Sequence, residues 1–279
     1  MKLLRAMGCW PAPLRIGLFL MVLGAAWLPL GLPLYGVEER WTAAGPLALG
    51  LLYIVFLGLL PGWGRRIHDL SQPYRTLGLH HPGKMVAGLG VGLALGYLSV
   101  GALLGLQIGL GWGTLQPLPL AMGHYVWQGC LVGLGVGMAE ELFFRGWLLF
   151  ELEQDYSMAV ALWGDAGLFA IAHYLRPLAA ILDSLPQFVG LLLLGLTLVW
   201  ARRTRLGHRS PSLALPIGLH GGLVGAYYVV DVTDMVRPAA HISPWLTGIG
   251  QNPLAGLLGL ALLGSLAYGF YRGCHRRLP

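Results

Sequence analysis

The chain has 279 residues, of which 56% are hydrophobic and only 11% are charged, and its mean hydropathy is +0.67. About a quarter of the residues of a soluble domain are charged, so this composition excludes an ordinary soluble enzyme or binding module. The formal net charge is +6.

Eight apolar segments approach the roughly 20 residues that a helix needs to cross a bilayer. In chain order they are Ile16–Leu34, Ala44–Pro61, Met85–Leu110, Ala121–Phe150, Met158–Tyr174, Gln187–Ala201, Leu213–Val230 and Pro253–Tyr271. The sequence therefore predicts an all-α, polytopic membrane helix bundle with about eight transmembrane helices. We expect residues 1–279 to form a single integral membrane domain, because no polar stretch is long enough to fold alone.

The basic residues predict how this bundle is oriented. If the N-terminus is cytosolic and the loops alternate between the two sides, only Arg40, Arg176 and Arg237 of the 18 Lys and Arg residues fall outside. Because Lys and Arg are enriched in cytosolic loops, both termini are expected in the cytosol. Membrane orientation and anionic lipids thus account for the net charge, and no nucleic-acid partner is predicted.

The longest polar stretch, Gly62–Lys84, is expected to be a basic cytosolic connector that sets the topology. A short amphipathic piece that lies on the lipid surface is the alternative. His68, His80 and His81 fall in this stretch and are expected to be solvated.

A glycine stripe runs along the fourth segment. Gly129, Gly133 and Gly137 recur every four residues, and Glu141 and Arg145 continue the same stripe. Small residues at this spacing allow membrane helices to approach closely, so the stripe is predicted to face other helices.

The same segment contains charges within an apolar sequence, "MAEELFFRGWLL". An ionisable group near the bilayer centre costs on the order of 3 kcal/mol, so pairing, water or function must offset each one. Glu141 and Arg145 have the spacing and the order of a helical ion pair. Glu140 points about 100° away from Glu141 and has no partner at helical spacing, and a carboxylate in that position suits a general base.

Two histidines lie on other segments. His173 follows Phe169 by one turn and Asp165 by two, and His220 lies in "PIGLHGGL". At 1.5 Å per residue from the cytosolic helix ends, Glu140, His173 and His220 lie at depths of roughly 15, 22 and 11 Å, which would let them converge on one pocket. A carboxylate and two imidazoles beside water favour amide hydrolysis, whereas the alternative for each histidine is a satisfied core residue.

At these residues the sequence resembles the CPBP (CAAX protease and bacteriocin-processing, Abi) family of intramembrane glutamic endopeptidases. The family motifs are E-E-x-x-x-R, then F-x-x-x-H, then H-x-x-x-N or D. The matching residues here are Glu140, Glu141 and Arg145, then Phe169 and His173, then His220. The resemblance covers approximately residues 121–231, which we take as the family-like catalytic core.

The resemblance implies an eight-helix bundle with a cavity open to the cytosol. It implies that Glu140 is the general base, that His173 binds or orients the water, and that His220 stabilises the oxyanion, with Glu141, Arg145 and Phe169 in support. The expected substrate is a membrane-bound or lipidated peptide or protein, the other partners are membrane lipids, and the expected location is a bacterial-type cytoplasmic (inner) membrane.

One position departs from the family pattern, because Val224 stands where the third motif has Asn or Asp. Removing one oxyanion donor typically costs about 100- to 1,000-fold in rate. Tyr227, Tyr228 or Gln187 would be substitute donors. The alternative function is therefore a proteolytically weak or inactive family member that acts as a membrane scaffold, chaperone or immunity factor.

Two further alternatives remain. Glu140, His173 and His220 are also a possible two-histidine, one-carboxylate zinc site, although we expect no cofactor because no ligand pair has a short fixed spacing.

The segment Asp231–Asn252 is expected to be a solvated exterior loop, with a cap over the cavity as the alternative. A transporter is not favoured, because no paired inverted repeat is apparent.

Overall fold

The computed structural model describes residues 6–174, 187–206, 211–249 and 252–275. The chain groups into two compact units, Met1–Leu77 with Phe150–Tyr156, and Gly78–Leu149 with Ser157–Pro279. The expected single domain stays a prediction. Several charges used for the orientation lie outside the described residues, namely Lys2, Arg5, Arg176, Arg209, Arg276 and Arg277.

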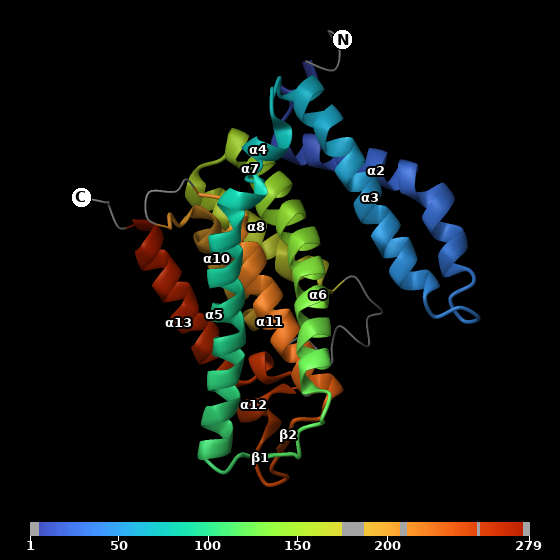
Figure 1. The fold of residues 1–279 in the computed structure, drawn as a ribbon. Helices are drawn as coiled ribbons and strands as arrows, with labels where there is room; N and C mark the ends of the chain where they lie inside the picture. Colours follow the sequence, from blue (N-terminus) through green and yellow to red (C-terminus); the bar gives the residue numbers. More distant parts are fainter. Residues whose placement is uncertain (1–5, 175–186, 207–210, 250–251, 276–279) are drawn as a thin grey trace. The chain divides into compact units, whose positions relative to one another are not determined.

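Each of the eight predicted segments contains a helix (Figure 1). These helices are α2 (Ala12–Tyr35), α3 (Ala44–Ile67), α5 (Pro82–Gly109), α6 (Met122–Glu141), α8 (Met158–Ala172), α10 (Phe188–Arg203), α11 (Ala214–Val232) and α13 (Leu257–His275). Shorter elements are α4 (Pro73–Thr76), η1 (Leu142–Leu148), α7 (Leu149–Asp155), α12 (Pro244–Thr247) and η4 (Pro253–Ala255). The predicted polytopic helical membrane bundle is confirmed.

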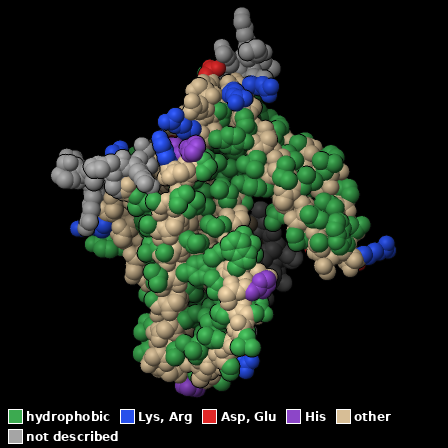
Figure 2. All heavy atoms as spheres, in the orientation of Figure 1, with side chains coloured by type: hydrophobic (Ala, Val, Ile, Leu, Met, Phe, Trp, Pro, Cys, Tyr) green, Lys and Arg blue, Asp and Glu red, His purple; other side chains and the backbone are tan. Residues whose placement is uncertain are grey.

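Among the described residues, α2, α3, α5, α11 and α13 are long and apolar enough to cross a membrane, and α8 is a shorter apolar helix. Large side chains on these helices point outward, for example Met21 (66% exposed), Ile54 (65%) and Leu98 (70%). On the face shown in Figure 2, hydrophobic side chains cover most of the helical surface. Such a surface suits contact with lipid, and the protein is an integral membrane protein.

A small sheet was not predicted. Strand β1 (Gly113–Leu115) pairs antiparallel with β2 (Val236–Pro238), so that Thr114 lies opposite Arg237. Strands of three residues are too short to show the alternation from which a strand is predicted.

Helix α11 packs between α5 and α6, and glycines on these helices let the backbones come into direct contact. A Cβ on Gly137 would lie 2.7 Å from the Ile217 carbonyl oxygen, and a Cβ on Gly133 would overlap the carbonyl oxygen of Gly221. On the opposite side of α11, a Cβ on Gly96 would lie 2.5 Å from the Leu223 nitrogen. The prediction that the glycine stripe faces another helix is confirmed, and this packing fixes α11 next to the helix that carries Glu140.

In the first unit, α3 continues past the predicted end at Pro61 to Ile67. A proline inside a helix removes the hydrogen bond to the carbonyl four residues earlier. The Tyr74 hydroxyl donates to that carbonyl, Leu57 O, at 2.6 Å. The predicted end was therefore wrong, because a side chain from α4 satisfies the carbonyl that Pro61 leaves without a donor.

The segment around "EELFFRGWLL" is helical but not uniformly α-helical. Between α6 and α7 lies the π-helical segment η1, from Leu142 to Leu148. A π-helix is rare and occurs frequently at functional sites. It begins directly after Glu140 and Glu141, and it contains Arg145.

Candidate active site

Three helices of the second unit bring Glu140, His173 and His220 together. Glu140 Oε2 lies 3.8 Å from His173 Nε2 and 3.9 Å from His220 Nε2. Glu140 is near the end of α6, His173 caps the end of α8, and His220 is inside α11. The convergence expected from helix depth is therefore present, while the catalytic roles of these residues stay predictions.

The exposed fractions of these side chains differ. Those of Glu140 and His173 are 32% and 30% exposed, whereas that of His220 is 4% exposed. Glu140 Oε2 has no hydrogen-bond partner among the described residues. Distances of 3.8–3.9 Å are too long for direct hydrogen bonds but suit a bridging water.

The second nitrogen of each imidazole has a fixed partner. His173 Nδ1 lies 2.8 Å from the Phe169 carbonyl oxygen, and His220 Nδ1 lies 2.8 Å from Glu141 Oε1. A carbonyl or carboxylate oxygen accepts, so both Nδ1 atoms donate. In the neutral imidazoles Nε2 then carries a lone pair, and both lone pairs are available on the side of Glu140.

A closed ion-pair cluster supports His220. Arg145 Nη1 donates to Glu141 Oε1 at 3.0 Å, which confirms the pair predicted from the i, i+4 spacing. Glu141 Oε1 thus accepts from both Arg145 and His220. Both side chains of the ion pair are fully buried, so the pair holds the His220 ring in one orientation.

Asp165 is a further member of this cluster that the sequence interpretation did not assign to the site. Its Oδ1 lies 3.3 Å from Arg145 Nε, and both side chains are fully buried. Arg145 Nη2 also donates to the Gly195 carbonyl oxygen at 3.2 Å. A signal was present, because Asp165 is the single acid of an apolar helix and lies two turns before His173.

Phe169 packs at the centre of the cluster. Its ring centroid lies 4.5 Å from that of His173 and 6.0 Å from that of His220. The Arg145 guanidinium lies 4.3 Å from the same centroid, at cation–π distance. Phe169 therefore orients the two imidazoles and the guanidinium at once.

The carboxylates of this cluster outnumber its guanidinium groups. Glu140, Glu141 and Asp165 supply three carboxylates, while Arg145 supplies one guanidinium. Buried charge must be compensated. His220 lies between two of these acids, with Nε2 3.9 Å from Glu140 Oε2 and Nδ1 2.8 Å from Glu141 Oε1.

The same three side chains were considered as zinc ligands. Two imidazoles and a carboxylate suit zinc chemically, and both imidazoles donate Nδ1–H as metal-binding histidines commonly do. In the described part of the chain, no group of three His, Cys, Asp or Glu side chains is placed to hold a metal ion. The expectation of a cofactor-free site is not tested by this arrangement.

Val224 is half-buried on α11, one turn beyond His220. Two of the three suggested substitute donors are engaged elsewhere, since Tyr228 donates to Gln128 Oε1 at 3.3 Å and Tyr227 lines another cavity. Gln187 is half-buried at the start of α10.

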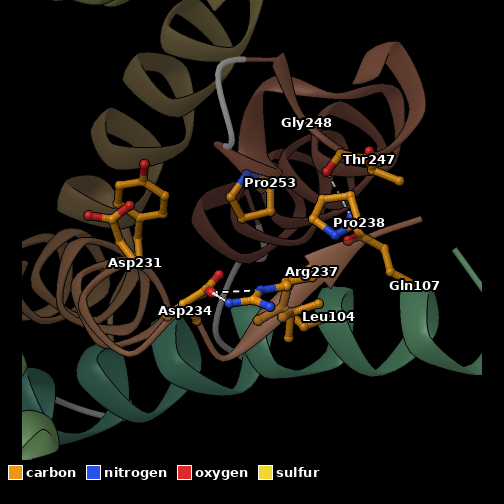
Figure 3. Close-up of a pocket in the computed structure, with 12 residues that line it drawn as sticks. Leu104, Gln107, Asp231, Asp234, Arg237, Pro238, Thr247, Gly248 and Pro253 are labelled. Carbon is orange, nitrogen blue, oxygen red and sulfur yellow. Dashed lines mark hydrogen bonds and ion pairs between the residues drawn. The ribbon is translucent and has the colours of Figure 1, made fainter. Parts of the chain in front are cut away.

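That other cavity has a volume of about 420 Å³ and is lined partly by residues of the predicted exterior segment (Figure 3). Asp234 accepts from Arg237 Nε at 2.7 Å, and Gln107 Nε2 donates to the Thr247 carbonyl oxygen at 2.9 Å. The exterior segment thus folds around its own cavity, with Trp245 58% exposed.

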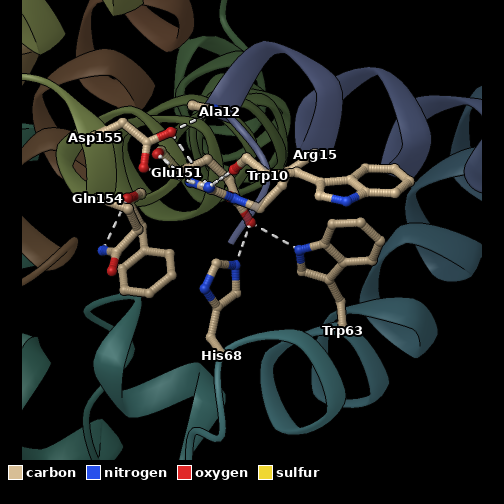
Figure 4. Close-up of polar contacts among 9 residues, drawn as sticks. Trp10, Ala12, Arg15, Trp63, His68, Glu151, Gln154 and Asp155 are labelled. Carbon is tan, nitrogen blue, oxygen red and sulfur yellow. Dashed lines mark hydrogen bonds and ion pairs between the residues drawn. The ribbon is translucent and has the colours of Figure 1, made fainter. Parts of the chain in front are cut away.

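His68 corrects one expectation. It was predicted to be solvated, but its side chain is only 8% exposed and its Nε2 lies 2.8 Å from Glu151 Oε1 (Figure 4). Arg15 Nε donates to Glu151 Oε2 at 2.8 Å, and Trp63 Nε1 donates to Oε1 at 2.7 Å. His68 is buried because it contacts the buried carboxylate of Glu151, which lies 83 residues later in the sequence. His80 is half-buried, and His81 is exposed as expected.

Together, the fold and the site define an integral membrane protein with a carboxylate–imidazole site inside a helical bundle. Residues 122–225, which include Glu140, His173 and His220, match the family model described as "Type II CAAX prenyl endopeptidase Rce1-like". The match supports the resemblance to the CPBP family of CAAX proteases and, in general terms, a CAAX-type intramembrane protease. No curated protein and no solved structure matches the chain.

Proposed function

We propose that the protein is an intramembrane endopeptidase in which Glu140 activates water to hydrolyse peptide bonds. The observation that carries this proposal is the approach of Glu140 Oε2 to the Nε2 atoms of His173 and His220, at 3.8 and 3.9 Å. A partly exposed carboxylate between two imidazoles is equipped for proton transfer. The family match supports the same class of reaction.

In the first step a water molecule is bound by Glu140 Oε2 and by the lone pair of His173 Nε2. Glu140 takes one proton from this water, and the resulting hydroxide attacks the carbonyl carbon of the scissile peptide bond. The C–N bond then breaks, and Glu140 returns the proton to the leaving amine. The hydrogen bond to the Phe169 carbonyl keeps His173 in the tautomer that accepts from water.

His220 stabilises the oxyanion of the tetrahedral intermediate. In its protonated form it donates Nδ1–H to Glu141 and has Nε2–H left for the substrate oxygen. Glu141, Arg145 and Asp165 hold the ring and supply charge, and none of them needs to contact the substrate.

The proposed substrates are membrane-associated or lipidated peptides, and the name of the matched family points to prenylated ones. An active carboxylate within a membrane bundle favours a substrate that partitions into the bilayer. On the distribution of Lys and Arg, the proposed location is a bacterial-type cytoplasmic membrane with both termini in the cytosol.

The test is hydrolysis in H₂¹⁸O by the purified full chain in lipid nanodiscs. The substrates are one peptide with and without a C-terminal prenyl group, and mass spectrometry detects the products. We expect faster cleavage of the prenylated peptide and one ¹⁸O in the new carboxylate. Cleavage without ¹⁸O, or no cleavage of any membrane-anchored peptide, would contradict the proposal.

The metal-free mechanism needs a separate measurement. We expect the purified protein to contain much less than one zinc ion per chain. We also expect the cleavage rate to stay the same after a chelator is added. Loss of the rate on chelation and its return with zinc would instead assign Glu140, His173 and His220 as zinc ligands.

A second candidate function is a membrane scaffold, chaperone or immunity factor with weak or absent proteolysis. The observation in its favour is the apolar, half-buried Val224 at the position of the usual Asn or Asp. Full complementation of a deletion strain by Glu140→Ala would support this function, and loss of complementation would support the peptidase.

A further inference from the structure

A groove between α2 and α3 lies in the first unit, outside the candidate active site. Its volume is about 310 Å³, and its α2 wall includes Leu18, Phe19 and Val22. The Phe19 ring packs edge to face on Trp63, with centroids 5.1 Å apart. The Trp63 indole is itself fixed by its hydrogen bond to Glu151, so this wall of the groove is rigid and apolar.

The α3 wall is formed partly by glycines. A Cβ on Gly58 would meet no atom within 4 Å, so the space beside it is open. A Cβ on Gly62 would meet only the Arg66 guanidinium, with Nη1 at 3.3 Å. Because glycine has no side chain, room remains along one side of α3 that the described residues do not fill.

Arg66 supplies a charge at one end of the groove. Its guanidinium folds back over Gly62 and lines the groove, although the residue is exposed. Arg66 forms no ion pair with any residue in the described ranges, in contrast to Arg15, whose guanidinium is held by Glu151 and Asp155. The positive charge of Arg66 is therefore available to a ligand.

The groove has a charged end and an apolar end. Eight residues separate Gly58 from Arg66, which corresponds to about 12 Å along the helix. Arg66 lies in the last turn of α3, whereas Gly58 lies within the apolar part of this spanning helix. The positive-inside rule assigns the Arg65–Arg66 end to the cytosolic side, where the leaflet contains anionic lipids.

We propose that this groove binds one anionic phospholipid, with its phosphate on Arg66 and one acyl chain along Gly58 and Gly62. Charge complementarity favours an anionic lipid, because the groove combines a free guanidinium with an apolar channel, and none of the described residues that line it is an acid. A guanidinium binds phosphate through paired hydrogen bonds. The proposal does not depend on the peptidase activity.

The test is native mass spectrometry of the purified full chain with phosphatidylglycerol or phosphatidylcholine of identical acyl chains. Arg66→Gln is compared with Arg65→Gln, the neighbouring arginine that does not line the groove. We expect Arg66→Gln to lower the preference for phosphatidylglycerol about fivefold, the effect typical of one basic residue. Arg65→Gln should keep the preference of the wild type.

A second pair of variants tests the channel. Gly58→Leu places a side chain in the open space, and Gly50→Leu is the matched control, because Gly50 is also unobstructed but does not line the groove. We expect Gly58→Leu to reduce the bound phosphatidylglycerol and Gly50→Leu to leave it unchanged. Equal binding by Arg66→Gln and Arg65→Gln, or wild-type binding by Gly58→Leu, would overturn the proposal.

Discussion

Two carboxylate clusters in the described part of the chain differ in the way that a structural site would differ from the proposed reactive one. In the first unit, Glu151 accepts from Arg15, His68 and Trp63 at 2.7–2.8 Å, and its side chain is fully buried. In the second unit, Glu140 lies 3.8–3.9 Å from two imidazoles and is about one-third exposed. Both clusters combine an acid with histidine, but Glu140, unlike Glu151, keeps an oxygen without a hydrogen-bond partner in the described part of the chain.

This comparison shows that a glutamate beside histidine is not enough to indicate catalysis. A satisfied polar network rigidifies the protein around it. A carboxylate that can still accept a hydrogen bond is able to bind water and take its proton. The Glu151 cluster therefore predicts effects on stability, and the Glu140 cluster predicts effects on rate.

The largest expected effect on stability comes from Glu151→Ala. It leaves the buried Arg15 without its main partner, and breaking a buried ion pair in this way typically costs about 3–5 kcal/mol. The measurement is the free energy of unfolding in detergent. The control is Glu153→Ala, because Glu153 is exposed on the same helix, and equal stability of the two variants would contradict a structural role for Glu151.

Asp165→Asn should have the next largest effect. It removes the carboxylate that lies 3.3 Å from Arg145 Nε while keeping the shape of the side chain. Breaking a buried ion pair typically costs about 3–5 kcal/mol, but Glu141 still pairs with Arg145, so a smaller destabilisation of about 2 kcal/mol is expected. An unfolding free energy equal to that of the wild type would show that Asp165 does not support Arg145.

How much of these clusters the sequence predicts depends on the distance between partners along the chain. Glu141 and Arg145 are one turn apart, so their ion pair follows from helical spacing. The meeting of Glu140, His173 and His220 follows from motif order and helix depth. Glu151 and His68 are 83 residues apart, and no local pattern relates them, so His68 was wrongly placed in solvent.

The fold shows the same limit. Hydrophobicity predicts all eight long helices, because lipid demands apolar segments of fixed length. It does not predict the π-helical turn at Leu142–Leu148, which depends on packing and not on composition. It also misplaces the end of α3 at Pro61. The hydrogen bond from the Tyr74 hydroxyl to the Leu57 carbonyl oxygen, which lets the helix continue, is a tertiary contact.

Val224→Asn tests whether the candidate active site lacks a hydrogen-bond donor, through its effect on the cleavage rate. If the active site lacks an oxyanion donor at this position, adding one should raise the cleavage rate of the anchored peptide by about tenfold, a fraction of the usual effect of such a donor. Val224→Leu is the control for changed packing. An unchanged rate in Val224→Asn would mean that the site does not use a donor there.

The smallest expected effect is a pH dependence of stability. Burial raises the pKa of Glu151, but hydrogen bonds from His68 and Arg15 outweigh burial and lower the pKa below its usual value. The carboxylate therefore stabilises the fold above the pKa of an unfolded glutamate, and this contribution is lost as the pH falls through the lower folded-state value. Titration from pH of about 5 downward should destabilise the wild type more than Glu151→Gln. Equal slopes would contradict the assignment.

The most direct test of the proposed active site is the cleavage rate of Glu140→Gln in the same nanodiscs as the wild type, with the unfolding midpoint measured on the same samples. Because Glu140 Oε2 makes no hydrogen bond within the described residues, this variant should remain as stable as the wild type. Its rate should fall by at least about 100-fold, the lower end of the contribution of a general base. A stable Glu140→Gln protein that cleaves the peptide at the wild-type rate would contradict the account.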